Sequence, residues 1–113
     1  MRQLLEQVRD KKAQLALSFI NAGEVYYVTF RKQGAARSKE ILEDLRAMPI
    51  ELFDAPENRI LAAAEFKANY SLSYADAFAA ALAQELNATL VTGDPEFRQL
   101  ASIVQIMWLP QRP

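Results

Sequence analysis

The sequence contains no cysteine and no histidine among its 113 residues. Without them there can be no thiol nucleophile, Ser/His/Asp triad, imidazole base or Cys/His zinc site. No apolar run approaches the roughly 20 residues of a membrane-spanning helix, and the N-terminus lacks the basic-then-apolar pattern of a signal peptide. These absences leave carboxylates, hydroxyls and amines for any chemistry, and they predict a cytoplasmic protein without a membrane partner.

An excess of charge of either sign is also missing. Thirteen Lys and Arg residues stand against fourteen Asp and Glu residues, which leaves a net charge of -1. No global basic field therefore draws the chain to nucleic acid, and any such contact must be local. The composition is 51% apolar and 24% charged, which is typical of globular proteins. A chain of this length supports one core, so we expect a single domain over residues 1–113.

Apolar periodicity and turn residues predict an alternation of strands and helices. We expect strands at 14–20, 50–53, 88–92 and 103–109, and helices at 22–33, 35–48, 57–68, 71–87 and 95–100. Residues 1–12 also show helical spacing. Strands that alternate with helices indicate an α/β protein with a mainly parallel sheet and helices on both faces.

Three carboxylates fall near junctions between these elements. Glu24 lies just past the first predicted strand, Asp94 directly follows the third, and Asp76 lies in the first turn of the helix at 71–87. The carboxyl ends of parallel strands share one edge of the sheet, and a helix N-terminus favours an ionised carboxylate. Because Mg²⁺ prefers oxygen ligands, this inventory suits phosphodiester hydrolysis by a metal-activated water.

Each carboxylate also satisfies a helix-capping rule. The segments Asn21 to Glu24 and Ser73 to Asp76 match the capping box, and Asp94 before Pro95 matches an N-cap followed by proline. Helix caps are far commoner than metal ligands, so spacing alone favours the capping interpretation.

The phrases around these carboxylates resemble the PIN-domain family, in particular its VapC-type toxin ribonucleases. Asn-Ala-Gly-Glu-Val-Tyr-Tyr-Val at 21–28 is similar to the phrase that carries an acidic residue after the family's second strand. Ser-Tyr-Ala-Asp-Ala at 73–77 resembles its Ser-x-x-Asp-Ala segment, and Thr-Gly-Asp-Pro-Glu-Phe at 92–97 resembles its Thr-x-Asp-x-x-Phe phrase. The resemblance covers essentially the whole chain.

This resemblance implies a PIN-like three-layer α/β/α fold and a Mg²⁺ or Mn²⁺ site used to hydrolyse RNA. It assigns Glu24, Asp76 and Asp94 to the metal, and Thr92 to a place beside it where it orients a ligand or water. In the VapC-type branch it further implies a homodimer and a cognate antitoxin whose peptide covers the site.

One departure from the family concerns the N-terminus. PIN domains open with a strand that ends in Asp, and no residue here matches that position, since Asp10 lies in the charged stretch Val8 to Lys12. We therefore expect an N-terminally truncated domain that lacks the first strand and the first acidic residue. Such a chain should bind Mg²⁺ poorly and cleave RNA weakly or not at all, and domain swapping in a dimer could cover the missing strand.

Two further interpretations remain, one for a basic stretch of the surface and one for the function of the whole chain. Arg31, Lys32, Arg37 and Lys39 form a basic stretch that could meet RNA phosphates, although a solvated helix face explains it equally well. A non-catalytic PIN-like interaction protein, in which the carboxylates serve only as helix caps, is the alternative to the nuclease.

Overall fold

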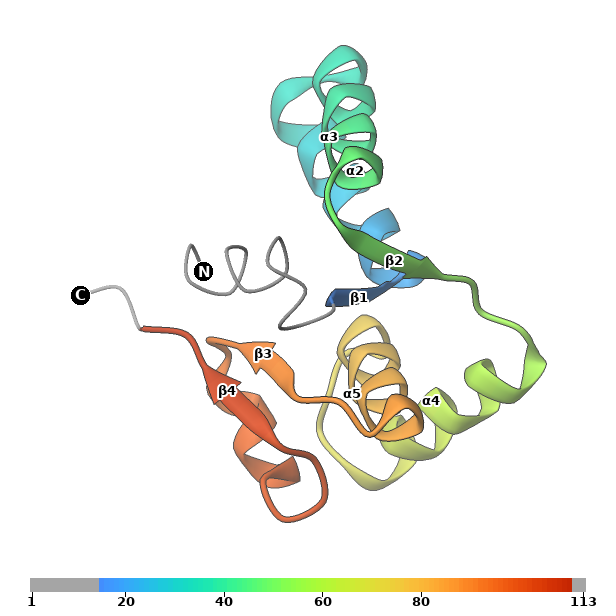
Figure 1. The fold of residues 1–113 in the computed structure, drawn as a ribbon, viewed down its shortest axis with the longest axis vertical. Coiled ribbons are helices and arrows are strands. Elements are labelled where there is room, and N and C mark those ends of the chain that lie inside the picture. Colours follow the sequence, from blue (N-terminus) through green and yellow to red (C-terminus); the bar gives the residue numbers. More distant parts are fainter. Residues whose placement is uncertain (1–14, 111–113) are drawn as a thin grey trace. The chain divides into compact units, whose positions relative to one another are not determined.

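The computed structural model of the protein describes residues 15–110, which fall into two compact units divided between Asp54 and Ala55 (Figure 1). The helical prediction for residues 1–12, including Asp10, lies outside the described residues. Within residues 15–110, no helix is both long and apolar enough to cross a membrane.

The first unit is a pair of parallel strands connected through two helices. Its elements are β1 (Leu15–Ser18), α2 (Phe19–Gln33), α3 (Ala35–Ala47) and β2 (Ile50–Phe53). β1 and β2 pair in a register that places Leu15 opposite Ile50. Parallel strands need a long crossover connection, which α2 and α3 supply.

Gly34 separates the two helices of the first unit, as the sequence predicts. Its φ of 89° lies in the region that favours glycine, and its N–H donates to the Phe30 carbonyl at 2.9 Å. The reversal brings α2 and α3 together, so that the Arg46 guanidinium lies 5.5 Å from the centre of the Phe19 ring. Ser38 is fully buried in this hairpin, and its hydroxyl donates to the Ala35 carbonyl at 2.8 Å.

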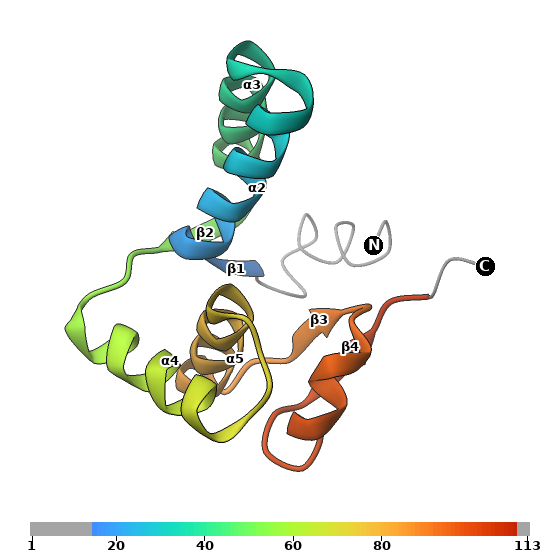
Figure 2. The ribbon, with the colours of Figure 1, turned by 180° about the vertical axis from the view of Figure 1, so that it is seen from behind.

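The second unit combines a helical hairpin with a second parallel pair of strands. Its elements are α4 (Glu57–Asn69), α5 (Tyr74–Leu86), β3 (Leu90–Thr92), the 3₁₀ helix η1 (Pro95–Leu100) and β4 (Ile106–Trp108). β3 and β4 pair with Leu90 opposite Ile106. Figure 2 shows α4 beside α5, and β3 beside β4, from behind.

The buried core of the second unit is built around α5. Its many alanines allow close approach of neighbouring elements, and Ala77 and Ala80 have no exposed surface. Around this helix pack apolar residues of α4, of the α4–α5 loop, of β3, and of η1 with the turn after it, namely Ala63, Phe66, Leu72, Leu90, Phe97, Leu100 and Val104. The short η1 is thus held to the core by two side chains, Phe97 and Leu100.

The sequence predictions are confirmed for the kind and order of all nine described elements. Several of these elements are shorter than predicted. The helix predicted at 71–87 begins at Tyr74 because the Ser73 hydroxyl caps it. The last strand begins at Ile106, not Ile103, because the N–H groups of Ile103 and Val104 both donate to the Leu100 carbonyl in a turn.

The prediction that Asn21 caps a helix at 22–33 is wrong. The structure starts α2 at Phe19, and the Ser18 hydroxyl at the end of β1 accepts from the Ile20 N–H at 3.1 Å. Serine is as good an N-cap as asparagine, and it occurs three residues earlier, so the strand passes directly into the helix. The strand predicted to reach Ile20 accordingly ends at Ser18.

The expected α/β class with parallel strands is confirmed. Both strand pairs are parallel, and one two-stranded sheet lies in each unit of the described chain. The three-layer arrangement and the single domain concern how the units assemble, and both stay predictions.

An ion pair joins α4 to α5 on the surface of the second unit. Arg59 donates to both carboxylate oxygens of Glu85, with Nη2 2.9 Å from Oε2 and Nε 3.0 Å from Oε1. The hydrogen bond from Arg59 holds the pKa of Glu85 below the ordinary 4.5, against the opposing effect of burial, and the Arg59 charge adds a smaller lowering. The pair is partly solvated, so its contribution to stability is modest.

This ion pair predicts a pH-dependent contribution to stability. Because the pKa of Glu85 is lowered on folding, its contribution is full above pH 4.5 and is lost as pH falls through the lowered pKa. Glu85→Gln should lower the free energy of unfolding by about 0.5 kcal/mol at neutral pH. At a pH below the lowered pKa, where Glu85 is protonated in both states, the substitution should have no effect. Urea unfolding at several pH values measures this difference. Glu65→Gln, at an exposed position of α4, is the matched control, and an equal loss there would contradict the prediction.

The packing of η1 predicts a second effect on stability. Leu100 is completely buried, so Leu100→Ala should lower the free energy of unfolding by about 3 kcal/mol through lost apolar burial and a new cavity. Leu61→Ala makes the same change where the side chain is 55% exposed, and should cost well under 1 kcal/mol. Chemical denaturation measures the free energy of unfolding of both variants. Equal decreases in the two variants would contradict this account of the core.

Candidate metal centre

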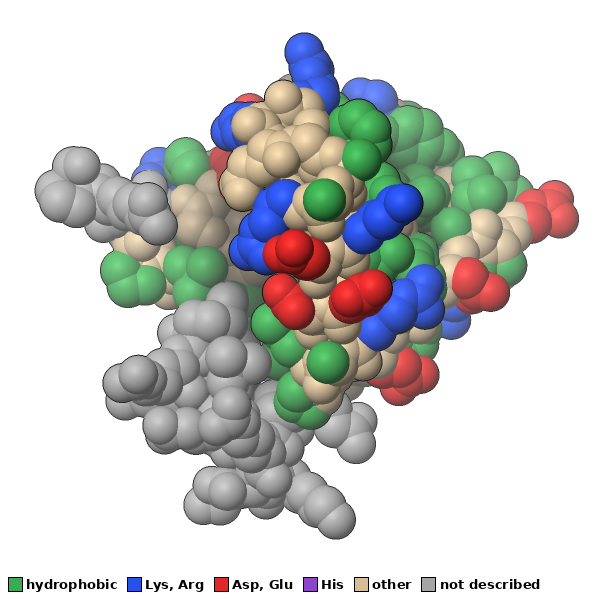
Figure 3. Space-filling view, turned by 90° about the horizontal axis from the view of Figure 1, so that it is seen from above, with side chains coloured by type: hydrophobic (Ala, Val, Ile, Leu, Met, Phe, Trp, Pro, Cys, Tyr) green, Lys and Arg blue, Asp and Glu red, His purple; other side chains and the backbone are tan. Residues whose placement is uncertain are grey.

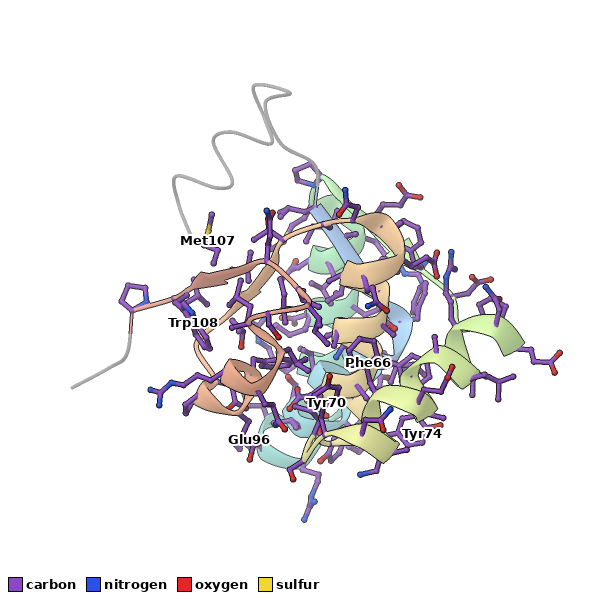
Figure 4. All side chains as sticks on the ribbon, turned by 90° about the horizontal axis from the view of Figure 1, so that it is seen from below. Phe66, Tyr70, Tyr74, Glu96, Met107 and Trp108 are labelled. Carbon is purple, nitrogen blue, oxygen red and sulfur yellow. The ribbon has the colours of Figure 1, made fainter. Side chains whose placement is uncertain are left out.

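Three carboxylates of the second unit converge in space. Asp76, Asp94 and Glu96 each offer an oxygen, and these oxygens all lie within 4.8 Å of one another. Asp76 comes from the start of α5, whereas the other two come from the turn after β3 and the start of η1. Figure 4 shows Glu96 on η1. We call these three residues the acidic cluster.

Asp76 is placed by the N-terminal cap of α5. The Ser73 hydroxyl accepts from the Asp76 N–H at 3.1 Å, which makes Asp76 the third residue of the helix, as the capping-box pattern predicts. Its carboxylate therefore lies at the positive end of the helix dipole.

Asp94 is placed by the turn that follows β3. Its N–H donates to the Thr92 hydroxyl at 3.0 Å, and its Oδ1 accepts from the Glu96 N–H at 2.9 Å as the N-cap of η1. The predicted capping role of Asp94 is thereby confirmed. The same carboxylate belongs to the acidic cluster, so capping and clustering use one side chain together.

Glu96 was missed by the sequence reasoning. It is an exposed residue in the first turn of η1, two positions after Asp94. The signal was present in the phrase Thr-Gly-Asp-Pro-Glu-Phe, because a short helix capped by an acid brings a second acid of its first turn close to the cap. The resemblance to the PIN-domain family assigns only Asp94 of this phrase to the metal, so it does not point to Glu96.

Glu24 lies in the first unit, on α2. It is exposed and stands in the second turn of the helix, since α2 begins at Phe19. The capping box proposed for Asn21 and Glu24 is therefore wrong, and the capping explanation for Glu24 is removed. Its place beside Asp76 and Asp94 stays a prediction.

The basic stretch occupies the first unit. Arg31 and Lys32 lie in the last turn of α2, and Arg37 and Lys39 lie on α3. Arg37 is 2.9 Å from the Glu40 carboxylate in an exposed ion pair. In Figure 3, Lys and Arg side chains are interspersed with Asp and Glu side chains. Contact with RNA at these residues stays a prediction, with part of the Arg37 charge already paired.

The acidic cluster suits a hard divalent cation. Mg²⁺ and Mn²⁺ bind carboxylate oxygens and tolerate several water ligands, so a few acids on one side are sufficient. Like charges at this separation repel by an amount on the order of 1 kcal/mol per pair even in water, and a cation between them reverses that sign. The donors in the cluster are all oxygens, and the chain has no histidine or cysteine that would select zinc.

The family model of the PIN domain matches residues 1–103. This match spans both units and most of the chain, so the chain belongs to the PIN-domain family. The predicted resemblance is confirmed at this level. No curated protein sequence is similar enough to the chain to stand as a relative.

Solved structures share the fold at low sequence identity. VapBC2 from Rickettsia felis, bound to a DNA fragment from their promoter, has a TM-score of 0.72 at 20% identity, covering 94% of this chain and 81% of that one. VapBC-1 from nontypeable Haemophilus influenzae has a TM-score of 0.69 at 20% identity, covering 94% and 84%. DNA-bound VapBC from Salmonella typhimurium has a TM-score of 0.71 at 17% identity, covering 90% and 80%. At these identities the likeness shows a common fold.

The double role of Asp94 predicts that its two substitutions separate stability from metal binding. Asp94→Asn keeps an oxygen for the Glu96 N–H, so the free energy of unfolding should change by less than about 0.5 kcal/mol, whereas Asp94→Ala should lower it by about 1 kcal/mol. Both variants should lose Mn²⁺ binding, measured by calorimetric titration. Retention of wild-type Mn²⁺ affinity by Asp94→Asn would show that this carboxylate only caps η1.

Proposed function

We propose that this chain is a Mg²⁺- or Mn²⁺-dependent endoribonuclease of the VapC toxin type that acts in the cytoplasm. The observation that carries the proposal is the acidic cluster of Asp76, Asp94 and Glu96 in a member of the PIN-domain family. The absence of cysteine and histidine agrees with it, because hydrolysis at a carboxylate-held cation requires neither.

In the proposed mechanism, Asp76, Asp94 and Glu96 would hold the cation, and the family resemblance implies Glu24 as a further ligand. When bound there, Mg²⁺ would supply Lewis-acid chemistry for phosphodiester hydrolysis, with activation of water and compensation of the charge that develops. The chain's own part is to fix the carboxylates before substrate arrives. Thr92 helps to fix Asp94, because its hydroxyl oxygen accepts a hydrogen bond from the Asp94 N–H. The Thr92 hydroxyl proton can then donate to a water or a phosphate oxygen and orient it.

The proposal includes an antitoxin and a second copy of the chain as partners. The similar structures are described as VapBC assemblies, and one more, from Klebsiella pneumoniae, as a toxin-antitoxin complex. A cognate antitoxin peptide would cover the acidic cluster and exclude RNA from it. The homodimer, with or without exchange of a strand, follows from the resemblance alone.

The non-catalytic interaction protein remains the second candidate. It is favoured by the capping bonds of Ser73 and Asp94, which give the phrases around two of the acids a structural purpose without any metal. The two candidates differ in whether the chain binds a cation.

The nuclease proposal predicts cation-dependent cleavage that requires the acidic cluster. In millimolar Mn²⁺, the chain should cleave single-stranded RNA slowly, and Asp76→Asn should lower the rate at least 10-fold because one charged ligand is lost. Asp44→Asn changes the charge equally at an exposed position of α3 and should retain the wild-type rate. Cleavage of a fluorescent RNA, with and without EDTA, provides the measurement.

The competing outcomes are distinct. Equal rates for the wild type and Asp76→Asn would point to a contaminating nuclease. If millimolar Mn²⁺ gave neither a thermal shift nor heat of binding, the nuclease would be rejected and the interaction protein favoured.

A further inference from the structure

Gln99 joins two segments of the second unit that are distant in sequence. Its side-chain Oε1 accepts from the Ser71 N–H at 3.1 Å, and its Nε2 donates to the Ser71 carbonyl at 3.2 Å. The same Nε2 donates to the Glu96 carbonyl at 2.9 Å. One exposed side chain thus makes three hydrogen bonds to main-chain atoms of two segments, on the η1 helix and on the α4–α5 loop.

These two segments lead to the two sides of the acidic cluster. Ser71 lies in the loop that enters α5, two residues before the Ser73 cap and five before Asp76. The Glu96 carbonyl belongs to a cluster residue itself, and the Glu96 N–H is bound by Asp94. The described structure therefore connects the Asp76 side and the Asp94–Glu96 side through the amide of Gln99.

A primary amide suits this position for a chemical reason. It presents an acceptor and a donor side by side, which matches the N–H and C=O of one residue, as in a strand pair. Its second N–H remains for another carbonyl. A side chain of the same length without the amide would make none of these three hydrogen bonds.

We infer that Gln99 is a positioning residue for the metal site, holding η1 to the entrance of α5 so that the acids from both segments stay close enough to share one cation. The inference rests on the proposed function. A cation gains most from carboxylates that are already close, because separated ligands must be brought together against their mutual repulsion when it binds. Gln99 acts through the main chain and touches neither cation nor substrate.

The test compares Gln99→Met with Gln84→Met in the full chain. Methionine keeps the length of glutamine without its amide. Gln84 is an exposed glutamine near the opposite end of α5, so its substitution controls for the change of side chain. Titration calorimetry with Mn²⁺ measures affinity, and thermal unfolding in EDTA measures the stability of the metal-free fold.

We expect Gln99→Met to bind Mn²⁺ about tenfold more weakly than the wild type, in the range found when partners that orient metal ligands are removed. The metal-free melting temperature should stay within a few degrees of that of Gln84→Met, which should bind Mn²⁺ like the wild type. Such a split between affinity and stability would not arise from a purely structural residue.

Three results would overturn the inference. Equal Mn²⁺ affinity in Gln99→Met and the wild type would show that Gln99 does not organise the site, while leaving the proposed nuclease intact. Unfolding of Gln99→Met in EDTA at room temperature would make Gln99 a residue that the fold itself requires. A wild type that binds no Mn²⁺ would remove the proposed function, and the inference with it.

Discussion

The burial of α5 is the constraint on which the second unit depends. Its alanine-rich surface packs against α4 on one side, and Phe97 and Leu100 of η1 belong to the same core. Because close packing leaves little freedom of movement in a core, the start of α5 and the start of η1 are held in a defined relation. Asp76 stands at the first of these starts, with Asp94 and Glu96 at the second. Apolar packing thereby brings these charged groups together despite their mutual repulsion.

Capping and metal binding, which the sequence presents as rival explanations, are compatible in this structure. The Ser73 hydroxyl uses the N–H of Asp76 and leaves its carboxylate free to join the acidic cluster. Asp94 gives one oxygen, Oδ1, to the Glu96 N–H, and a carboxylate can accept several partners. Helix starts are suitable places for acidic ligands because the cap orients the side chain while the dipole favours its charge.

A feature of this structure could be predicted from the sequence when the interactions that determine it join residues close together in the chain. Gly34 could be predicted to end α2 because a positive φ is a property of one residue, and Ser73 could be predicted as a cap because its partner is three residues away. The start of α2 was misplaced because Ser18 and Asn21 are both good caps, and the extent of the β1–β2 pairing decides between them. Glu96 could not be predicted because its role as a possible metal ligand depends on its closeness to Asp76, twenty positions away in the chain.

The sequence by itself determined the order and kind of the described elements, the absence of thiol and imidazole chemistry, and the phrases that resemble the PIN-domain family. These depend on local propensity, on residue inventory and on short motifs, all of which are present in the chain before it folds. Only the tertiary structure decided that Glu96 joins Asp76 and Asp94, and that Gln99 bridges η1 to the loop before α5. The physical reason is that proximity between segments distant in sequence comes from shared burial in one core, which no local pattern encodes.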